Sequence, residues 1–234
     1  MEAMVAKLAP PGFELDQEYS GPGEDDRMDT AFEHAADRVA PSFFQEDVSA
    51  VKAHKSVAYI LSPRIPKAAA MQMSGMTLQM VATMLEGGAL AAKSESAGVA
   101  HGFRKWVHLF SEYKTGYTQA DPVRYANALY DAWVRRPLSD GKWWYSCGMH
   151  LLGLPDIEIE PRNDPREAIQ CIDFIGTRLL AGETIENLLV DKIILPEKDL
   201  PPEKTEPKSL HHLVCKRYES DDFFYNPYGY IRVT

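Results

Sequence analysis

The segment from residue 142 to residue 160 constrains the fold more than any other part of the chain. Its sequence, KWWYSCGMHLLGLPDIEIE, is too long for one average strand and too rich in β-forming residues for a helix. Gly148 and Gly153 predict a bulge or bend, and Leu154-Pro155 predicts a break. After the break, isoleucines alternate with acidic residues, so the two kinds of side chain point to opposite faces. This alternation is typical of a half-buried strand.

Three further segments carry strong helix signals. Asp121-Pro122 and Asp164-Pro165 each place an N-cap carboxylate before a proline at the first helical position, and Glu167 adds a capping-box pattern to the second. Methionines recur three and four residues apart between residues 67 and 88, where Gly87-Gly88 supplies a C-cap. We interpret the methionine stripe as core rather than as an adaptable binding surface. The predicted helices span 121–137, 164–182 and 67–88.

A fourth predicted helix, 98–113, is strongly amphipathic, with one apolar face and one cationic face. The cationic face would suit phosphate or an acidic partner, but in an acidic chain we favour a solvated helix surface. The apolar residues are Val99, Phe103, Trp106, Val107 and Phe110, and the cationic ones are His101, Arg104, Lys105 and His108.

Short apolar or alternating runs predict the remaining strands. We expect strands at 56–62, 89–94, 186–196 and 210–220, with 56–62 buried. The order strand, helix, glycine, strand occurs at 56–93 and again at 143–195, which suggests two β-α-β-like halves. The predicted fold class is α+β, with a mixed or antiparallel sheet and helices packed mainly on one face.

Composition shifts along the chain predict four parts. Residues 1–40 are expected to form a loose acidic leader with a short helix at 30–40, and residues 41–195 an α+β core domain. Residues 196–209 are expected to form a Pro/Lys/Glu linker or long loop. Residues 210–234 add a strand and an aromatic tail that contains the turn signature Asn226-Pro227-Tyr228-Gly229. We expect the tail to dock on the core as a hairpin or cover; the alternative is display to a partner or a second copy.

Net charge and cysteine usage narrow the classes of function. A formal charge of −9, with 45% hydrophobic and 25% charged residues, indicates a globular protein that binds neither nucleic acid nor anionic membranes non-specifically. Cys147, Cys171 and Cys215 are far apart in the sequence and predict reduced thiols. The N-terminus lacks a signal-peptide pattern, and no apolar run is long enough to span a membrane. We therefore expect a cytoplasmic protein.

Candidate catalytic residues are His54, His150, Asp156 and Glu158. Two carboxylates two residues apart on a strand lie roughly 6.5–7 Å apart, which suits acid/base chemistry with a histidine partner. A solvated acidic edge that discourages strand addition is the interpretation we favour. Cys147 and His150 would form a thiol dyad only across a bulge, so we favour a buried cysteine and a hydrogen-bonded histidine. The sequence has no Gly-rich phosphate loop, no G-x-S-x-G elbow and no HExxH, so we expect neither a cofactor nor a metal.

The central segments resemble, in order, a bacterial family known only as a domain of unknown function. The matching residues are His54, Gly88-Ala89, Gly148-Met149 and the GLPDIE box at 153–158, and the resemblance covers about residues 50–182. It implies an α+β fold with no established chemistry, similar in scale to the small acidic proteins found beside bacterial toxins and secretion systems. The aromatic strand that the family has around its Gly-Ala segment has no counterpart in ALAAKS at 89–94, so a pocket formed there would differ.

These observations favour a non-enzymatic protein-binding factor of an immunity-like or accessory kind, whose partner is another protein or a second copy. Its expected anchors are the aromatic residues Phe224, Tyr225, Tyr228 and Tyr230. The first alternative is a hydrolase or transferase with a histidine-carboxylate site around the GLPDIE box. The second is a structural homo-oligomer.

Overall fold

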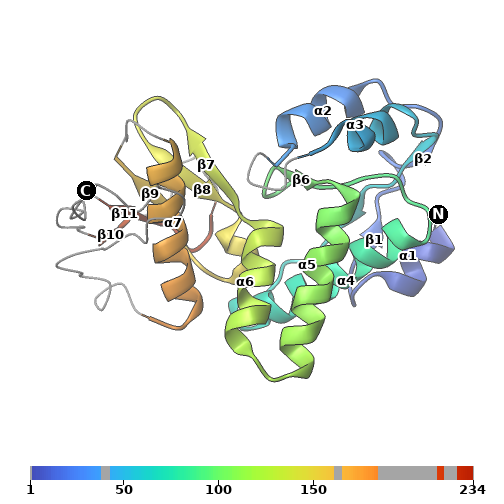
Figure 1. Ribbon diagram of the computed structural model, residues 1–234. Coiled ribbons are helices and arrows are strands. Elements are labelled where there is room, and N and C mark those ends of the chain that lie inside the picture. The colour runs from blue at the N-terminus through green and yellow to red at the C-terminus, as the bar shows by residue number, and fades with distance from the viewer. Residues whose placement is uncertain (1, 38–42, 161–164, 184–214, 219–225, 234) are drawn as a thin grey trace, which may run out of the picture. The chain divides into compact units, whose positions relative to one another are not determined.

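The computed structural model describes residues 2–37, 43–160, 165–183, 215–218 and 226–233, with the backbone alone at 215–218 (Figure 1). Its helices and small sheets confirm the predicted α+β class. The chain forms two units: residues 1–135 with 151–153, called here the N-terminal unit, and residues 136–150 with 154–234, called the C-terminal unit. The boundary therefore falls inside the segment predicted as one core domain, 41–195.

Six helices with described bounds belong to the N-terminal unit. They are α1 (Glu2–Leu8), α2 (Arg27–Ala35), α3 (Gln45–Lys52), α4 (Ala70–Glu86), α5 (Phe103–Thr118) and α6 (Pro122–Trp133), with a 3-10 turn at Lys67–Ala69 before α4. Helices α4, α5 and α6 pack on one another (Figure 1). The approach of α5 to α6 depends on Gly116, because a β-carbon there would lie 2.6 Å from the backbone nitrogen of Tyr125.

The helix predicted to begin at Asp121-Pro122 is confirmed as α6. The Asp121 carboxylate accepts a hydrogen bond from the backbone N–H of Arg124 at 3.0 Å, and Pro122 occupies the first turn. The methionine-rich helix is confirmed as α4, which ends before Gly87, and Gly88 adopts a positive φ of 105°. Helix α7 (Pro165–Leu180) confirms the helix predicted at 164–182, whereas its predicted N-cap, Asp164, lies outside the described residues.

The N-terminal unit also holds three small two-stranded antiparallel sheets. β1 (Glu14–Leu15) pairs with β4 (Ile60–Leu61), β2 (Gly21–Pro22) with β3 (Ser56–Val57), and β5 (Ala92–Ser94) with β6 (Val99–His101). The prediction of one buried strand at 56–62 is wrong, because this run is split between two sheets and Leu61 is 46% exposed. Its apolar side chains line a cavity instead of packing in a core.

The predicted amphipathic helix 98–113 begins later than expected, because residues 99–101 form β6 and α5 starts at Phe103. The cationic face is not a uniform solvated surface. His101 and Lys105 are 2% and 8% exposed, whereas Phe103, assigned to the apolar face, is 42% exposed. The structure thus contradicts the solvated interpretation for two of the four cations.

The C-terminal unit contains a five-stranded sheet with the order β10-β11-β9-β8-β7. The strands are β7 (Arg135–Ser139), β8 (Trp144–Cys147), β9 (Asp156–Ile159), β10 (Cys215–Tyr218) and β11 (Tyr230–Val233). β11 runs parallel to β9 and antiparallel to β10, so the sheet is mixed. Helix α7 contacts β8 and β9 (Figure 1). The buried core includes Ile157, Ile159, Ile231, Val233, Ile172 and Ile175.

The predicted alternation in the GLPDIE segment is confirmed, since Ile157 and Ile159 are fully buried. The predicted acidic edge is wrong: β9 is an interior strand, hydrogen-bonded to β8 on one side and to β11 on the other. The predicted tail hairpin is present as β10 and β11, and the Gly229 N–H donates to the Asn226 carbonyl at 2.9 Å in its turn. The predicted strand at 186–196 and the predicted linker at 196–209 lie outside the described residues.

Candidate ligand-binding cavity in the N-terminal unit

A cavity of about 970 Å³ lies within the N-terminal unit. Its volume falls at the upper end of the range typical of small-molecule sites. The wall is formed by α4, by the 54–62 and 87–96 segments, and by side chains from α1, α2, α5 and α6. Apolar side chains dominate, among them Met28, Phe32, Ile60, Val81, Met84 and Leu90.

Helix α4 supplies one wall through side chains at helical spacing. Thr77, Met80, Val81, Met84 and Leu85 recur at intervals that place them on one face, and all five line the cavity. Met80 and Leu85 are buried, whereas Thr77, Val81 and Met84 are half-buried. The methionine stripe was predicted to be core; the structure shows that it also forms a cavity wall. Methionine suits this position because its unbranched, polarizable side chain adapts to what it contacts.

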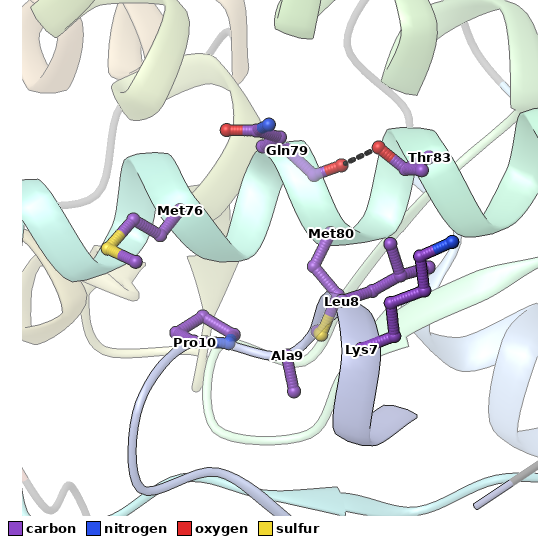
Figure 2. Close-up of a pocket in the computed structure, with 8 residues that line it drawn as sticks. All are labelled: Lys7, Leu8, Ala9, Pro10, Met76, Gln79, Met80 and Thr83. Atoms are coloured by element: carbon purple, nitrogen blue, oxygen red, sulfur yellow. Dashed lines mark hydrogen bonds between the residues drawn. The ribbon is translucent and has the colours of Figure 1, made fainter. Parts of the chain in front are cut away.

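The same helix borders a second, smaller cavity of about 210 Å³ on its side toward the N-terminal segment. Figure 2 shows Met76 and Met80 of α4 lying opposite Leu8, Ala9 and Pro10. Met80 therefore contributes to both cavities.

The polar groups in the inner wall of the large cavity are occupied by the protein itself. The indole N–H groups of Trp106 and Trp133 donate to the carbonyls of Ala92 (3.3 Å) and Ser74 (3.2 Å). The hydroxyl of Ser74 donates to the Leu151 carbonyl at 2.5 Å, and that of Thr77 to the Met73 carbonyl at 2.9 Å. At these four positions a molecule entering the cavity meets donors that the protein already uses, so apolar contact dominates there.

His54, a candidate catalytic residue, lies in this wall, but both of its ring nitrogens contact the backbone. Its Nδ1 lies 2.7 Å from the Val51 carbonyl, and its Nε2 accepts from the backbone N–H of Asp25 at 2.8 Å. Because Nε2 accepts, Nδ1 carries a hydrogen that it donates to the Val51 carbonyl. Both ring nitrogens are thereby used in holding the 51–54 turn against the 24–26 segment.

Asp156, in the C-terminal unit, is a half-buried residue at the start of β9 whose carboxylate accepts hydrogen bonds. Its carboxylate accepts from the Ser146 hydroxyl at 3.0 Å, the Met149 N–H at 3.1 Å and the Asn226 side-chain amide at 2.7 Å. Burial raises the pKa of this carboxyl to about 6, against the opposing effect of those three hydrogen bonds. Asp156 thus joins the end of β8, the Met149–Leu152 turn and the Asn226 turn, which is a structural role.

The other predicted site residues of the C-terminal unit have separate surroundings. Glu158 pairs with Arg232 at 2.7 Å across β9 and β11. His150 lies in the Met149–Leu152 turn, where burial lowers the pKa of its imidazole. Cys147 ends β8 and is half-buried, not buried as expected; Cys171 is buried, and within the described residues neither forms a disulfide. Within the described residues, no hydrogen bond or ion pair joins His54 or His150 to Asp156 or Glu158.

The predicted partner-binding residues are only partly described, since Phe224 and Tyr225 lie outside the described residues. Tyr228 is half-buried, and its backbone N–H donates to the Asn226 side chain at 2.8 Å. Tyr230 begins β11 and is also half-buried. The Arg232 guanidinium lies 4.2 Å from the centre of the Trp143 ring and 5.8 Å from that of Tyr230.

A buried charge cluster in the N-terminal unit was missed by sequence reasoning. Asp37, 8% exposed, contacts the Lys105 ammonium, and its Oδ2 lies 2.9 Å from Nδ1 of His101 in an alignment unsuited to a good hydrogen bond. Nε2 of His101 lies 3.0 Å from the Ala132 carbonyl. Burial alone would raise the pKa of Asp37, but the neighbouring imidazole of His101 and the ammonium of Lys105 outweigh it and hold the pKa well below its usual range. The four-residue spacing of His101 and Lys105 was a visible signal; their partner, far away in sequence, was not.

No protein-family model, curated protein or solved structure matches this chain. The resemblance to a domain of unknown function therefore stays an untested prediction. In the ranges that the structure describes, no group of histidine, cysteine and acidic side chains is arranged to hold a metal ion. Across the same ranges, the helices lack the combination of length and apolar character needed to cross a bilayer.

Proposed function

We propose that this protein is a non-enzymatic binding protein that takes up an apolar or amphipathic small molecule in the cavity of its N-terminal unit. The observation that carries the proposal is the cavity of about 970 Å³ with its methionine-rich and aromatic wall. Apolar concave sites of this size are the usual form of small-molecule sites in proteins. The occupied wall donors and the two used nitrogens of His54 favour binding over catalysis.

The proposal predicts a chain-length dependence of affinity. Each buried methylene contributes about 0.8 kcal/mol, so extending a linear alcohol by two carbons should tighten Kd about tenfold until the cavity is full. Displacement of a neutral apolar dye, N-phenyl-1-naphthylamine, measures these affinities. Affinity that does not change with chain length would contradict the proposal.

Val81→Trp provides the structural test. Val81 is half-buried in α4 and lines the cavity, so an indole at this position should occupy ligand space and weaken binding of dye and alcohols by at least about tenfold. Gln72→Trp is the matched control, because Gln72 is exposed on the same helix and lines neither cavity. Equal affinities in Val81→Trp, Gln72→Trp and the parent protein would place the binding site elsewhere.

Partner binding through the aromatic C-terminal residues is a second candidate function. Its support is the stacking of Arg232 on Trp143 beside Tyr230, because arginine and large aromatics dominate binding hot spots. If self-association uses this surface, the Tyr228→Ala/Tyr230→Ala double variant should sediment as a smaller species than the parent protein. Tyr117→Ala, at a residue 72% exposed in the N-terminal unit, is the control. An unchanged sedimentation coefficient in the double variant, with an unchanged urea midpoint, would remove this surface from self-association.

A further inference from the structure

Resting on the proposed function, we infer that the ligand is a single-chain amphiphile with an anionic head group, and that Lys93 binds that head at the edge of the cavity. Charged side chains occupy only a few positions of the mostly apolar wall. Among the described lining residues, the lysine and acidic side chains are Lys55, Lys93 and Glu95. All three belong to the 54–62 and 87–96 segments. The part of the wall formed by α4 and the two tryptophans contains none of them.

Lys93 is the best placed of these cations. Its side chain is only 12% exposed, although lysine rarely lies so far from water without a partner. The partner is Glu95, whose Oε1 lies 2.7 Å from the Lys93 ammonium, but the Glu95 side chain is 62% exposed. An ion pair with a largely solvated partner is weak, so an incoming anion can replace Glu95 while Glu95 returns to water.

Lys55 is less suitable. Its side chain is 78% exposed, and it pairs with Glu24, which lies outside the cavity lining. The hydration of an exposed ammonium leaves little to gain from a ligand anion. Lys93 therefore provides the expected head-group contact.

The β5–β6 turn adds a neutral donor beside Lys93. The Ser94 oxygen accepts from the backbone N–H of Ala97 at 3.3 Å and lies 3.5 Å from the Ser96 oxygen, a long contact from which the Ser94 hydroxyl can turn to an anionic oxygen. Ser94 and Lys93 both line the cavity. An ammonium and a hydroxyl from adjacent residues suit a carboxylate or a phosphate head group.

The apolar part of the ligand is inferred from the methionines that line the same cavity. Met28, Met80 and Met84 line the cavity and offer flexible side chains that follow the shape of an alkyl chain. Because the chain as a whole carries a net charge of −9, an anionic ligand needs a local cation to bind.

The test compares dodecanoate, dodecyl phosphate and dodecanol, below their micelle concentrations, by displacement of N-phenyl-1-naphthylamine from the full chain. We expect the better anion to bind about tenfold or more tightly than the alcohol. Lys93→Met should remove this preference, so that the anions bind no more tightly than dodecanol. Lys52→Met, at an exposed lysine outside the lining, should change nothing. Whichever anion binds more tightly identifies the head group as carboxylate or phosphate.

Glu95→Gln gives an independent readout at an exposed residue, where the fold is not at risk. Freed from its counter-ion, Lys93 should bind dodecanoate several-fold more tightly in this variant. Equal affinity for anion and alcohol, with no effect of Lys93→Met or Glu95→Gln, would overturn the head-group inference and leave the cavity proposal standing. Binding of none of the three ligands and no dye would overturn the cavity proposal itself.

Discussion

Replacing Asp37 with alanine is expected to destabilise the N-terminal unit by about 3–5 kcal/mol, the cost typical of removing one partner from a buried ion pair. The variant leaves His101 and Lys105 buried without the carboxylate that both contact. Urea denaturation gives the free energy of unfolding. Hydrogen exchange of peptides from α5 assigns the loss to this unit rather than to the C-terminal one.

Two further variants distinguish the loss of the buried cluster from the general effect of removing a charge on the free energy of unfolding. Glu33→Ala removes the same charge from an exposed position of α2 and should change the free energy of unfolding by less than about 0.5 kcal/mol. Lys105→Met leaves the Asp37 carboxylate with His101 and should cost less than Asp37→Ala, since an apolar chain replaces the lysine stem. A larger loss in Lys105→Met than in Asp37→Ala would mean that Asp37 is not the centre of the cluster.

Lowering the pH should reduce the stability that the same cluster provides. Because the pKa of Asp37 is held below the value of an unfolded aspartate, its contribution to stability is present above about pH 4 and lost as the pH falls. The parent protein should therefore lose more stability on acidification than Asp37→Ala, when each is compared with its own stability at neutral pH.

Asp156→Ala is expected to destabilise the C-terminal unit by about 2–4 kcal/mol at pH 5. The hydroxyl of Ser146 and the amide of Asn226, residues 2% and 3% exposed, both lose their acceptor, as does the Met149 N–H. A buried donor left without a partner costs about 1–3 kcal/mol. Urea midpoints combined with hydrogen exchange of β9 peptides measure the change in this unit.

The pH dependence of that loss has the opposite sign to that of Asp37. The folded pKa of about 6 exceeds the 3.8 of an unfolded aspartate, so the folded state binds the proton more tightly. The contribution of Asp156 is complete below about pH 4 and declines as the pH rises through 6. Between pH 5 and pH 7.5 the cost of Asp156→Ala should therefore shrink by about 1.4 kcal/mol.

Glu160→Ala is the control, because Glu160 is exposed at the end of the same strand. Its effect on the free energy of unfolding should be less than about 0.5 kcal/mol at either pH. If the cost of Asp156→Ala instead grew between pH 5 and pH 7.5, the three hydrogen bonds would outweigh burial and the carboxyl would have a lowered pKa.

Local sequence patterns determined the helices and the central strands. Asp121 and Pro122 specify the start of α6 because a cap carboxylate and a proline satisfy local geometry without any distant contact. The isoleucine alternation specifies the buried face of β9 because side chains of a strand alternate in direction. These signals depend only on residues close together in the sequence, so the sequence alone is enough to predict the elements.

Tertiary structure alone decided how these elements are used. The 56–62 run became two short strands beside a cavity because residues 14–15 and 21–22 pair with it, contacts between positions about 35–45 residues apart that leave no local mark. Asp156 became a half-buried acceptor rather than an exposed acid because β11, distant in sequence, pairs with β9 and places Asn226 beside it.

The residues of the candidate site show the same difference between local sequence patterns and tertiary contacts. The sequence by itself determined that α4 would have a methionine face, since this follows from helical periodicity. It also showed His101 and Lys105 four residues apart, although His101 lies in β6 and only Lys105 in α5. It did not determine that the methionines would border a cavity, nor that Asp37 would neutralise the cations. Burial and charge pairing depend on which distant segments meet, and only the folded chain brings those segments together.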